Sequence, residues 1–552
     1  MRTSALSRTM TGLRAQGAAT SRMPVAIPSD KPGTSCGLLF ALIVAAGLAG
    51  CGGSDSPVAT GPTVQALTAT CASLKGQTVG GVMVTDAKRI EANGTVNPAG
   101  MCQVSGTRAP YLDIEVDVPD NWSGRLLHQG GGGFDGSIPS AFTLAADGSV
   151  SAVSVAITQQ GAIYAASNGG NRRAVPAQAG PAVWANGTSD GQASGDDYSY
   201  RALGTTITFA KALAQSFYAS APKYTYFNGC SEGGREAYEV AQRWPDQYDG
   251  IVQGCETMDM TALVSGLLNV SSKAGTPAGP SAAQYAAAYA SAVAACDAGD
   301  GLVDGYLENP SGCNLDPATL QCGLPGANPD PTLCLSAAQA ATLKSALSDV
   351  VLATGAVAYS KYNWTNFNGL SAPAGGGLGG GFALLATNDA SWLTPVRQAA
   401  FNLNTDYYVI GNGLQRRGTD HDKQAIAAYV ASGKKLLSWN DSADPLVSAN
   451  DHARNHATMV QLASRLGLAD PRTNTRFFQV PANTHGAGGA FNQVDWLTAI
   501  INWVESGTAP SQLTYTFTVG TTQRSLPVCE YPKYPRYNGT GDVNAAASFT
   551  CT

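Results

Sequence analysis

The stretch that most constrains the fold is residues 227–236, FNGCSEGGRE. An aromatic and β-branched run at 223–227 leads into it and predicts a short buried strand, and helix-forming residues follow it. A strand, a tight glycine turn and a helix are the setting of a nucleophile elbow. There the Gly229-x-Ser231-x-Gly233 pattern holds the serine hydroxyl out on a strained turn. An ordinary turn with a helix-capping serine has the same local pattern, so the rest of the chain has to decide.

Short apolar runs that alternate with helical spacing predict an α/β fold. Helical spacing covers residues 198–218 and the residues after Ser231, and the runs typical of buried strands are 125–129, 162–167, 223–227, 250–255, 434–439 and 476–480. This alternation predicts a mostly parallel, doubly wound sheet with helices on both faces. Ligands bind such sheets at the carboxyl ends of the strands, which is where Ser231 lies.

The alternation of strands and helices stops in the middle of the chain, where an inserted lid is predicted. This segment contains an alanine-rich helix at 281–295 and a glycine tract at 375–381 that predicts flexibility. The two parts that flank the lid form one sheet domain, which we call the body. The predicted organisation is a leader at 1–50, a tether at 51–66, the first part of the body at 67–255, the lid at 256–433 and the second part of the body at 434–552.

The leader predicts export. It carries five basic residues against one acid, Asp30, and ends in an apolar run at 37–50 that is too short to span a bilayer as a helix. Residues 48–51, Leu-Ala-Gly-Cys, resemble the lipobox of bacterial lipoproteins, in which the cysteine becomes the lipid-modified first residue. We therefore expect lipidation of Cys51 and a protein that is anchored to a membrane, periplasmic or at the cell surface, or secreted. Ordinary cleavage nearby is the alternative.

Charge and cysteine content agree with export. The leader holds five of the 33 basic and one of the 39 acidic residues, so 28 and 38 remain, a formal charge of −10 that disfavours nucleic-acid binding. Without Cys36 of the leader and the lipidated Cys51, ten of 12 cysteines remain, an even number that suits a disulfide-permissive compartment. Local spacing suggests the pairs Cys71–Cys102, Cys296–Cys313, Cys322–Cys334 and Cys529–Cys551.

A nucleophilic serine needs a base and an orienting carboxylate, which in this fold follow it in the order acid, histidine. Of the five histidines, His485 alone follows a predicted strand, on a loop that can reach the carboxyl edge of the sheet. The acid should follow the strand at 434–439, where Asp441 and Asp444 are both candidates. We favour Asp444.

A glycine run at 130–133 follows another predicted strand. The Lys and Ser/Thr arrangement of a phosphate-binding loop is absent from it. We interpret the run as a loop of exposed backbone N–H groups beside the elbow, because acyl transfer needs preorganised donors where negative charge develops.

Together these residues resemble the tannase and feruloyl esterase family, which includes hydrolases of mono(2-hydroxyethyl) terephthalate. The resemblance spans roughly residues 70–551 and rests on the segments 229–236, 248–252 (YDGIV), 443–446 (ADPL) and 532–551. It implies an α/β-hydrolase with a large lid, in which Ser231 is the nucleophile, His485 the base and Asp444 the orienting acid. It also implies an oxyanion hole formed by the backbone N–H groups of Glu232 and Gly133.

The family binds a structural calcium ion in its lid, and residues 296–306 (CDAGDGLVDGY) offer ligands for one. Carboxylates with interleaved glycines suit a hard cation that takes six to eight oxygen ligands. An acidic turn closed by a disulfide is the alternative. By resemblance, the ligands are Asp297, Asp300, Asp304 and the carbonyls of Leu302 and Tyr306.

Two features depart from the family pattern. Most members bond the cysteine before the nucleophile to a cysteine directly after the histidine, but here that position is Gly486. Because Cys255 ends the next predicted strand and neighbouring strands lie about 4.8 Å apart, we predict a Cys230–Cys255 disulfide instead. Members that act on terephthalate monoesters hold the free carboxylate with a lid arginine, whereas residues 362–396 contain no Arg or Lys.

The resemblance implies a serine carboxylesterase that hydrolyses small esters of hydroxylated aromatic acids through an acyl-enzyme. A terephthalate monoester hydrolase of the same family and a non-catalytic, calcium-stabilised binding lipoprotein are alternatives. An amidase or peptidase with the same triad is another. Four lid aromatics could stack on a substrate ring or could equally form the lid core: Trp364, Phe367, Phe382 and Trp392.

Overall fold

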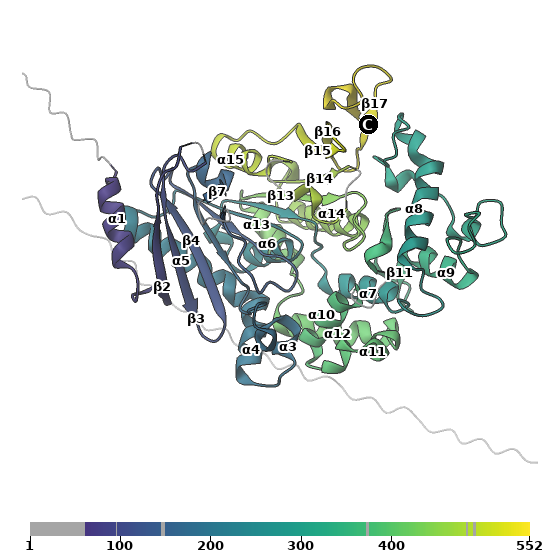
Figure 1. Ribbon diagram of the computed structural model, residues 1–552, viewed down its shortest axis with the longest axis horizontal. Helices are drawn as coiled ribbons and strands as arrows, with labels where there is room; N and C mark the ends of the chain where they lie inside the picture. Colours follow the sequence, from purple (N-terminus) through teal and green to yellow (C-terminus); the bar gives the residue numbers. More distant parts are fainter. Residues whose placement is uncertain (1–60, 95, 145–149, 371–374, 482–483, 490–492) are drawn as a thin grey trace, which may run out of the picture. The chain divides into compact units, whose positions relative to one another are not determined.

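A central sheet carries the elbow. The computed structural model describes residues 61–94, 96–144, 150–370, 375–481, 484–489 and 493–552, so the predicted leader, Cys51 and most of the predicted tether lie outside the described residues. The described residues form a sheet of 12 strands (Figure 1). In spatial order these are β1 (Thr78–Val79), β2 (Val82–Ile90), β3 (Met101–Arg108), β4 (Leu112–Pro119), β8 (Ile163–Ser167), β5 (Arg125–Gln129), β9 (Tyr224–Cys230), β10 (Gly250–Gly254), β13 (Lys435–Asp441), β14 (Thr475–Val480), β16 (Thr522–Glu530) and β15 (Leu513–Val519).

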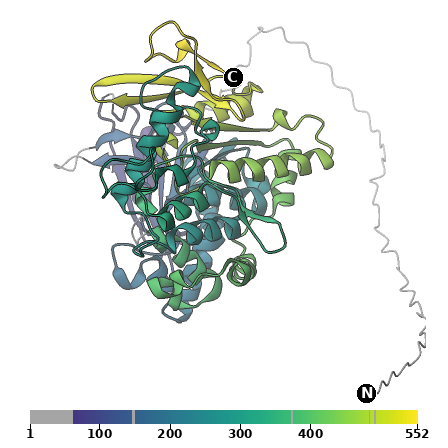
Figure 2. The same ribbon diagram turned by 90° about the vertical axis from the view of Figure 1, so that its right-hand side faces the viewer.

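The six central strands, from β8 to β14, run parallel to one another, as the sequence predicts. Both edges are antiparallel, which the sequence analysis did not predict: β1 to β4 form a meander that joins β8, and β15 and β16 form a hairpin beside β14 (Figure 2). The hairpin follows the last helix of the chain, and such local pairings need no crossover helix. The elbow therefore lies at the end of a central strand, away from both edges.

Helices cover both faces of the sheet. Strand residues alternate between the two faces; in β8, Ile163 and Ala165 face one hydrophobic core while Tyr164 and Ala166 face the other. One core packs α1 (Val64–Ser73), α5 (Ala202–Tyr218), α6 (Glu232–Arg243), α13 (Lys423–Ala431) and α14 (Ala449–Arg465) against the sheet. The other packs α2 (Val155–Thr158) and α15 (Trp496–Ser506). This is the α/β-hydrolase architecture that the resemblance implies.

The lid forms most of a third core, to which Val183, Trp184, Tyr198 and Val447 of the body also contribute. Its helices are α7 (Met260–Ser271), α8 (Ala282–Cys296), α9 (Ala337–Ala346), α10 (Gly375–Thr387), α11 (Pro395–Ala399) and α12 (Leu403–Arg417), with α10 packed against α7 and α12 (Figure 1). Two boundaries differ from the predicted ones. Helix α13 lies within residues 256–433, the predicted lid, but its buried residues belong to the core of the body. Helix α1 begins at Val64, inside the predicted tether.

The glycine tract at 375–381 is helical, which corrects the prediction of a flexible segment. Its glycines allow close packing: a Cβ at Gly379 would lie 3.0 Å from the Leu268 side chain of α7, and one at Gly381 would lie 2.3 Å from the ring of Phe134. Tertiary contacts thus outweigh the poor helix propensity of glycine. Within the described ranges, no helix is both long and apolar enough to cross a membrane.

Candidate active site

Ser231 lies on a strained turn between β9 and α6. Its φ is 61° and its ψ −122°, a conformation that costs a residue with a side chain about 1–3 kcal/mol. Its N–H donates to the carbonyl of Gly254 at 3.1 Å. Among the described residues its side chain caps no helix N–H, so the reading of Ser231 as a simple helix cap does not hold.

The two glycines of the motif allow backbone segments to approach each other. A Cβ at Gly229 would lie 2.2 Å from the carbonyl oxygen of Gly233, and one at Gly233 would lie 3.0 Å from the carbonyl oxygen of Gly131. Neither position has room for a side chain. The glycine run is thereby held against the elbow, and the Gly233 N–H donates to the Gly131 carbonyl at 3.1 Å.

Three side chains from separate parts of the chain form one hydrogen-bonded series. Nε2 of His485, on the loop after β14, lies 2.8 Å from Oγ of Ser231. Nδ1 of the same ring lies 2.7 Å from Oδ2 of Asp444, on the loop after β13. The other oxygen of Asp444 accepts the N–H groups of Leu446 and Val447 at 2.8 and 2.9 Å, which fixes the carboxylate.

Asp441, the alternative acid, hydrogen-bonds the backbone of the loop that carries His485. Its two oxygens accept the N–H groups of Gly486 and Gly488 at 2.8 and 3.1 Å, so it holds the loop that carries His485 rather than the imidazole itself. Burial raises the pKa of Asp441 well above its ordinary value. Of the two candidates, the structure places Asp444 on the histidine.

The charge of Asp444 dominates the electrostatics of His485. Burial is the largest single effect and lowers the pKa of the imidazole, but the charge and hydrogen bond of Asp444, together with the other nearby carboxyls, raise the pKa to about 9. The other carboxyls are those of Asp441 and Glu256. The arrangement stabilises an imidazolium beside Ser231, which is the form that His485 takes after it accepts a proton.

The two residues of the expected oxyanion hole, Glu232 and Gly133, line the same cavity as Ser231 and His485. The N–H of Glu232 is in the first turn of α6, where backbone donors have no acceptor within the helix. Gly133, with φ 62°, ends the glycine run, and its carbonyl accepts Oη of Tyr198 at 3.2 Å. Oη of Tyr198 also lies 2.5 Å from Oε2 of Glu232, so the Tyr198 side chain links the glycine run to the start of α6.

A narrow cavity opens above Ser231, between the body and the lid. Of the four lid aromatics, Phe382 lines it, whereas Trp364, Phe367 and Trp392 are buried in the lid core. A carboxyl group that was not predicted from sequence also lies in its wall, that of Glu256, two residues after the end of β10. The apolar part of the wall consists of Leu263, Leu267, Leu378, Phe382, Leu446 and Val447.

Comparison with known proteins identifies the family. The family model described as tannase and feruloyl esterase matches residues 96–388 and 417–552. The chain belongs to the tannase and feruloyl esterase family. It is therefore a carboxylic ester hydrolase by family.

Named relatives of this esterase act on different esters. It is 30% identical over 530 residues to mono(2-hydroxyethyl) terephthalate hydrolase of Piscinibacter sakaiensis, covering 82% of this chain and 84% of the relative. It is 27% identical over 481 residues to feruloyl esterase B of Aspergillus niger, covering 81% and 85%. The crystal structure of feruloyl esterase B from Aspergillus oryzae has a similar fold, with a TM-score of 0.72 and 21% identity over 88% of this chain and all of that one (100%).

Disulfides tie the esterase together at the pairs that the sequence analysis named. Cys230 and Cys255 are bonded, with their Cα atoms 5.2 Å apart, so the nucleophile strand is linked to its neighbour β10. Gly486 still lies beside this bond, because a Cβ there would be 3.5 Å from Sγ of Cys230. The other bonds are Cys71–Cys102, Cys296–Cys313, Cys322–Cys334 and Cys529–Cys551.

The acidic loop of the lid follows α8. Oδ2 of Asp297 accepts the N–H of Gly305 at 2.8 Å, and Oδ1 of Asp300 accepts that of Leu302 at 3.2 Å. Asp304 accepts Tyr306 N–H and pairs with Arg524 at 2.6 Å. Within the described residues, these three aspartates do not form a group whose oxygens all lie within 4.8 Å of one another. A fourth acid, Glu308, lies beside them and was missed from sequence; its N–H donates to Asp300 at 3.2 Å.

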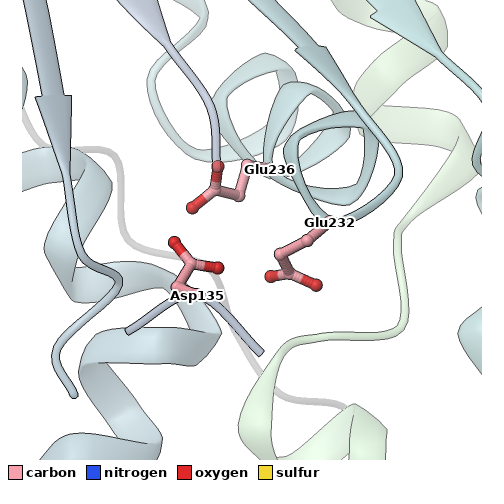
Figure 3. A group of neighbouring side chains, drawn as sticks. All are labelled: Asp135, Glu232 and Glu236. Carbon is pink, nitrogen blue, oxygen red and sulfur yellow. The ribbon is translucent and has the colours of Figure 1, made fainter. Parts of the chain in front are cut away.

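One group of three carboxyls in the described residues does meet that distance: Asp135, Glu232 and Glu236, behind the glycine run (Figure 3). Oε2 of Glu236 accepts the N–H of Gly131 at 2.9 Å. Asp135 is 1% exposed, and its two carboxyl oxygens meet no hydrogen-bond donor among the described residues. The sequence signal for this group was the pair of acids four residues apart in the first turns of α6, facing the glycine run.

A single buried cation, Arg235, lies in this cluster, with Nε 2.7 Å from Oε1 of Glu232. Burial raises the pKa of all three carboxyls, that of Asp135 well above its ordinary value and that of Glu236 to about 7. Arg235 and bound protons therefore balance the charge of the cluster near neutral pH. The cluster contacts the glycine run and the start of α6, the two segments that are expected to supply the oxyanion donors.

Proposed function

We propose that this ester hydrolase is a serine carboxylesterase that works through an acyl-enzyme. The observation that carries the proposal is the hydrogen-bonded series from Ser231 through His485 to Asp444, at 2.8 and 2.7 Å. A serine hydroxyl is a weak nucleophile until an adjacent base takes its proton. The described residues supply that base, its orienting carboxylate and two backbone donors around one cavity.

The geometry supports the following steps. Oγ of Ser231 attacks the ester carbonyl carbon as its proton passes to Nε2 of His485, and the carbonyl oxygen takes up negative charge facing the N–H groups of Glu232 and Gly133. The alcohol leaves with the proton that His485 returns, and the acyl group stays on Oγ. Water then gives its proton to His485 and its hydroxide to the acyl carbon, which releases the acid and restores Ser231.

We propose esters of hydroxylated aromatic acids as the substrate class. Relatives named feruloyl esterase support this, and so does a cavity with an apolar wall and one aromatic ring, Phe382. No Arg or Lys is among the described residues that line the cavity. The free carboxylate of a terephthalate monoester would meet no Arg or Lys side chain there, which makes that ester the weaker candidate.

The test is to label and screen the full-length protein. A fluorophosphonate should modify Ser231 stoichiometrically, as read by peptide mass spectrometry, and the Ser231→Ala variant should not be labelled. Methyl ferulate and methyl gallate should be hydrolysed faster than a terephthalate monoester. Folded protein that takes up no label, or that prefers the monoester, would contradict the mechanism or the substrate class respectively.

We also propose that the protein is exported and anchored by a lipid on Cys51. The leader and the Leu-Ala-Gly-Cys sequence support this, and five disulfides in the described residues fit an oxidising compartment. Mass spectrometry of the mature amino terminus would show the lipidated cysteine; an unmodified terminus at another residue would contradict the anchor.

We further propose a structural calcium ion in the lid, held by Asp297, Asp300, Asp304 and the carbonyls of Leu302 and Tyr306. Its support is an imbalance of buried charge. Oδ1 of Asp297 and both carboxylate oxygens of the neighbouring Glu308 are buried and meet no donor among the described residues. Buried carboxylates without donors are costly, and a hard divalent cation with oxygen ligands would compensate them.

The substitution Asp300→Asn should remove the calcium. Metal analysis of the purified variant should show a loss of about one ion per chain, and calcium should no longer raise its unfolding midpoint. In the wild type, calcium at 100 times its Kd should stabilise the fold by about 2.7 kcal/mol. The control is Asp316→Asn, an exposed lid acid paired with Lys344, which should keep both responses. Equal calcium content in all three proteins would contradict the site.

A further inference from the structure

The cavity above Ser231 contains an acid that the proposed mechanism does not use. Glu256 lines this cavity together with Ser231 and His485, although it is only 4% exposed. Its neighbours in the wall are aliphatic side chains of α7, α10 and the loop after β13. Ligand cavities of this kind are mostly apolar, and the few polar groups in them fix the orientation of the ligand. Glu256 is placed to act as such a group.

The side chain is held rigidly. Glu256 follows Cys255, whose disulfide ties the end of β10 to the residue before the nucleophile. The N–H of Thr257 donates to Oε1 at 2.8 Å, and the carbonyl oxygen of Glu256 accepts Nε2 of Gln253 at 3.1 Å. A Cβ at Gly234, on the elbow helix, would lie 2.8 Å from Cβ of Glu256, so helix and carboxyl are in close contact. The carboxyl group is thus fixed relative to Ser231.

The charge state of this carboxyl suits a hydroxyl partner. Burial raises the pKa of Glu256 to about 8. The hydrogen bond from the Thr257 N–H and the charge of His485 lower this pKa, whereas the charges of Glu232 and Asp444 raise it. No Arg or Lys is among the described residues of the wall. The group is therefore largely a neutral acid at pH 7, which both donates and accepts, and becomes an acceptor-only carboxylate at higher pH. A phenolic or alcoholic hydroxyl can pair with either form.

We propose that Glu256 is a specificity-determining residue whose carboxyl group hydrogen-bonds a hydroxyl group of the bound ester and disfavours an ester that carries a carboxylate there. The proposal rests on the proposed function, since it requires the ester to bind in the cavity above Ser231. It assigns the discrimination between hydroxylated esters and terephthalate monoesters to one side chain. A site built to pair with a hydroxyl loses binding energy with an ester that lacks one, because its polar group is left unpaired.

The experiment compares matched ester pairs in the full-length protein and two variants. The first pair is methyl 4-hydroxycinnamate and methyl cinnamate, which differ in one hydroxyl. The second is dimethyl and monomethyl terephthalate, which differ in one carboxylate. The readout is the ratio of kcat/KM within each pair, measured at pH 7 and pH 9 for the wild type, Glu256→Gln and Glu256→Leu.

In Glu256→Leu the preference for the hydroxylated ester should fall about 10-fold, the loss of one hydrogen bond. Glu256→Gln should keep the preference for the hydroxylated ester, because an amide also donates and accepts. The wild type should discriminate against the monomethyl ester more strongly at pH 9 than at pH 7, and Glu256→Gln should lose this pH dependence. The control Leu267→Ala enlarges the same cavity and should leave the hydroxyl preference unchanged.

Two results would overturn the inference. If both ratios in Glu256→Leu equal those of the wild type, while Ser231 is labelled normally in each protein, Glu256 does not select the ester although the proposed function holds. If the wild type is not labelled at Ser231 and hydrolyses none of the four esters, the proposed function fails and this inference fails with it.

Discussion

In the substitution Asp444→Asn, kcat should fall on the order of 10⁴-fold, with little change in the fold. Oδ2 of Asp444 lies 2.7 Å from Nδ1 of His485 and sets the tautomer in which Nε2 is free to accept the proton of Ser231. An asparagine amide at that place can donate to Nδ1, which leaves the proton on Nε2 and blocks the base. It also removes the negative charge that stabilises the imidazolium.

The pH dependence of kcat/KM should also change in Asp444→Asn. The attraction of Asp444 raises the pKa of His485, and the base acts only when the imidazole is neutral. Without that charge the pKa falls, so the rising limb of the residual kcat/KM should shift to lower pH. Stopped-flow hydrolysis of a p-nitrophenyl ester from pH 5 to pH 10 would measure both effects.

Asp441→Asn is the matched control, since Asp441 ends β13, Asp444 lies three residues later, and both are buried. Asp441 accepts the N–H groups of Gly486 and Gly488, and an asparagine oxygen would keep part of this support for the histidine loop. We expect a loss of kcat of about 10-fold, the effect of one weakened hydrogen bond on the placement of His485. Equal losses in the two variants would contradict the assignment of Asp444.

The nucleophile and the base could be predicted from sequence, but the choice between Asp441 and Asp444 could not be decided from it. Ser231 and His485 could be found because the α/β alternation places the ends of parallel strands at one edge, and each residue follows such a strand. Asp441 and Asp444 are only three residues apart, at and just after the end of β13, so periodicity does not distinguish them. Only the course of the chain after β13 decides which carboxylate reaches Nδ1.

Other features depended on tertiary packing. The glycine tract in α10 has poor helix propensity, and it is helical because Leu268 and Phe134 need its small residues. Charged residues are rarely buried, so Glu256 and Asp135 could not be placed in the interior from sequence. Both are buried beside the site because a strand end and a glycine turn carry them there. Acids that lie two residues after such elements are the signal to look for.

Arg235 should be the most costly charge to remove from the fold. Its guanidinium donates to Oε1 of Glu232 at 2.7 Å and to the carbonyls of Tyr198 and Ser199 at 2.7 and 2.9 Å, and its side chain is fully buried. The substitution Arg235→Met would leave a buried carboxylate without its cation and two carbonyls without a donor. We expect a loss of about 3–5 kcal/mol in the free energy of unfolding, measured by urea denaturation with tryptophan fluorescence.

The same substitution at an exposed ion pair provides the control. Arg472 is 63% exposed and pairs with Glu530 through two hydrogen bonds, and Arg472→Met should cost about 0–1 kcal/mol.

A second control is the double variant Arg235→Met with Glu232→Gln. It should recover part of the loss, because a neutral amide leaves no unpaired charge. No recovery would show that the two lost carbonyl bonds, and not the buried charge, account for the cost.

The cost of Arg235→Met should also grow with pH. Burial, followed by repulsion from Glu232, raises the pKa of Glu236 to about 7 from an ordinary value of 4.5. The stability linked to this group is fully present below pH 4.5 and is lost as the pH rises through about 7, because the folded chain then has to release a proton that it binds more tightly than the unfolded chain does. Arg235 opposes this loss, since its charge lowers the pKa of Glu236. Without it the folded pKa rises further, so the difference between wild type and variant should be larger at pH 8 than at pH 5. A difference independent of pH would mean that the carboxyls behind the glycine run are not coupled to Arg235, and that the oxyanion segments are held by packing alone.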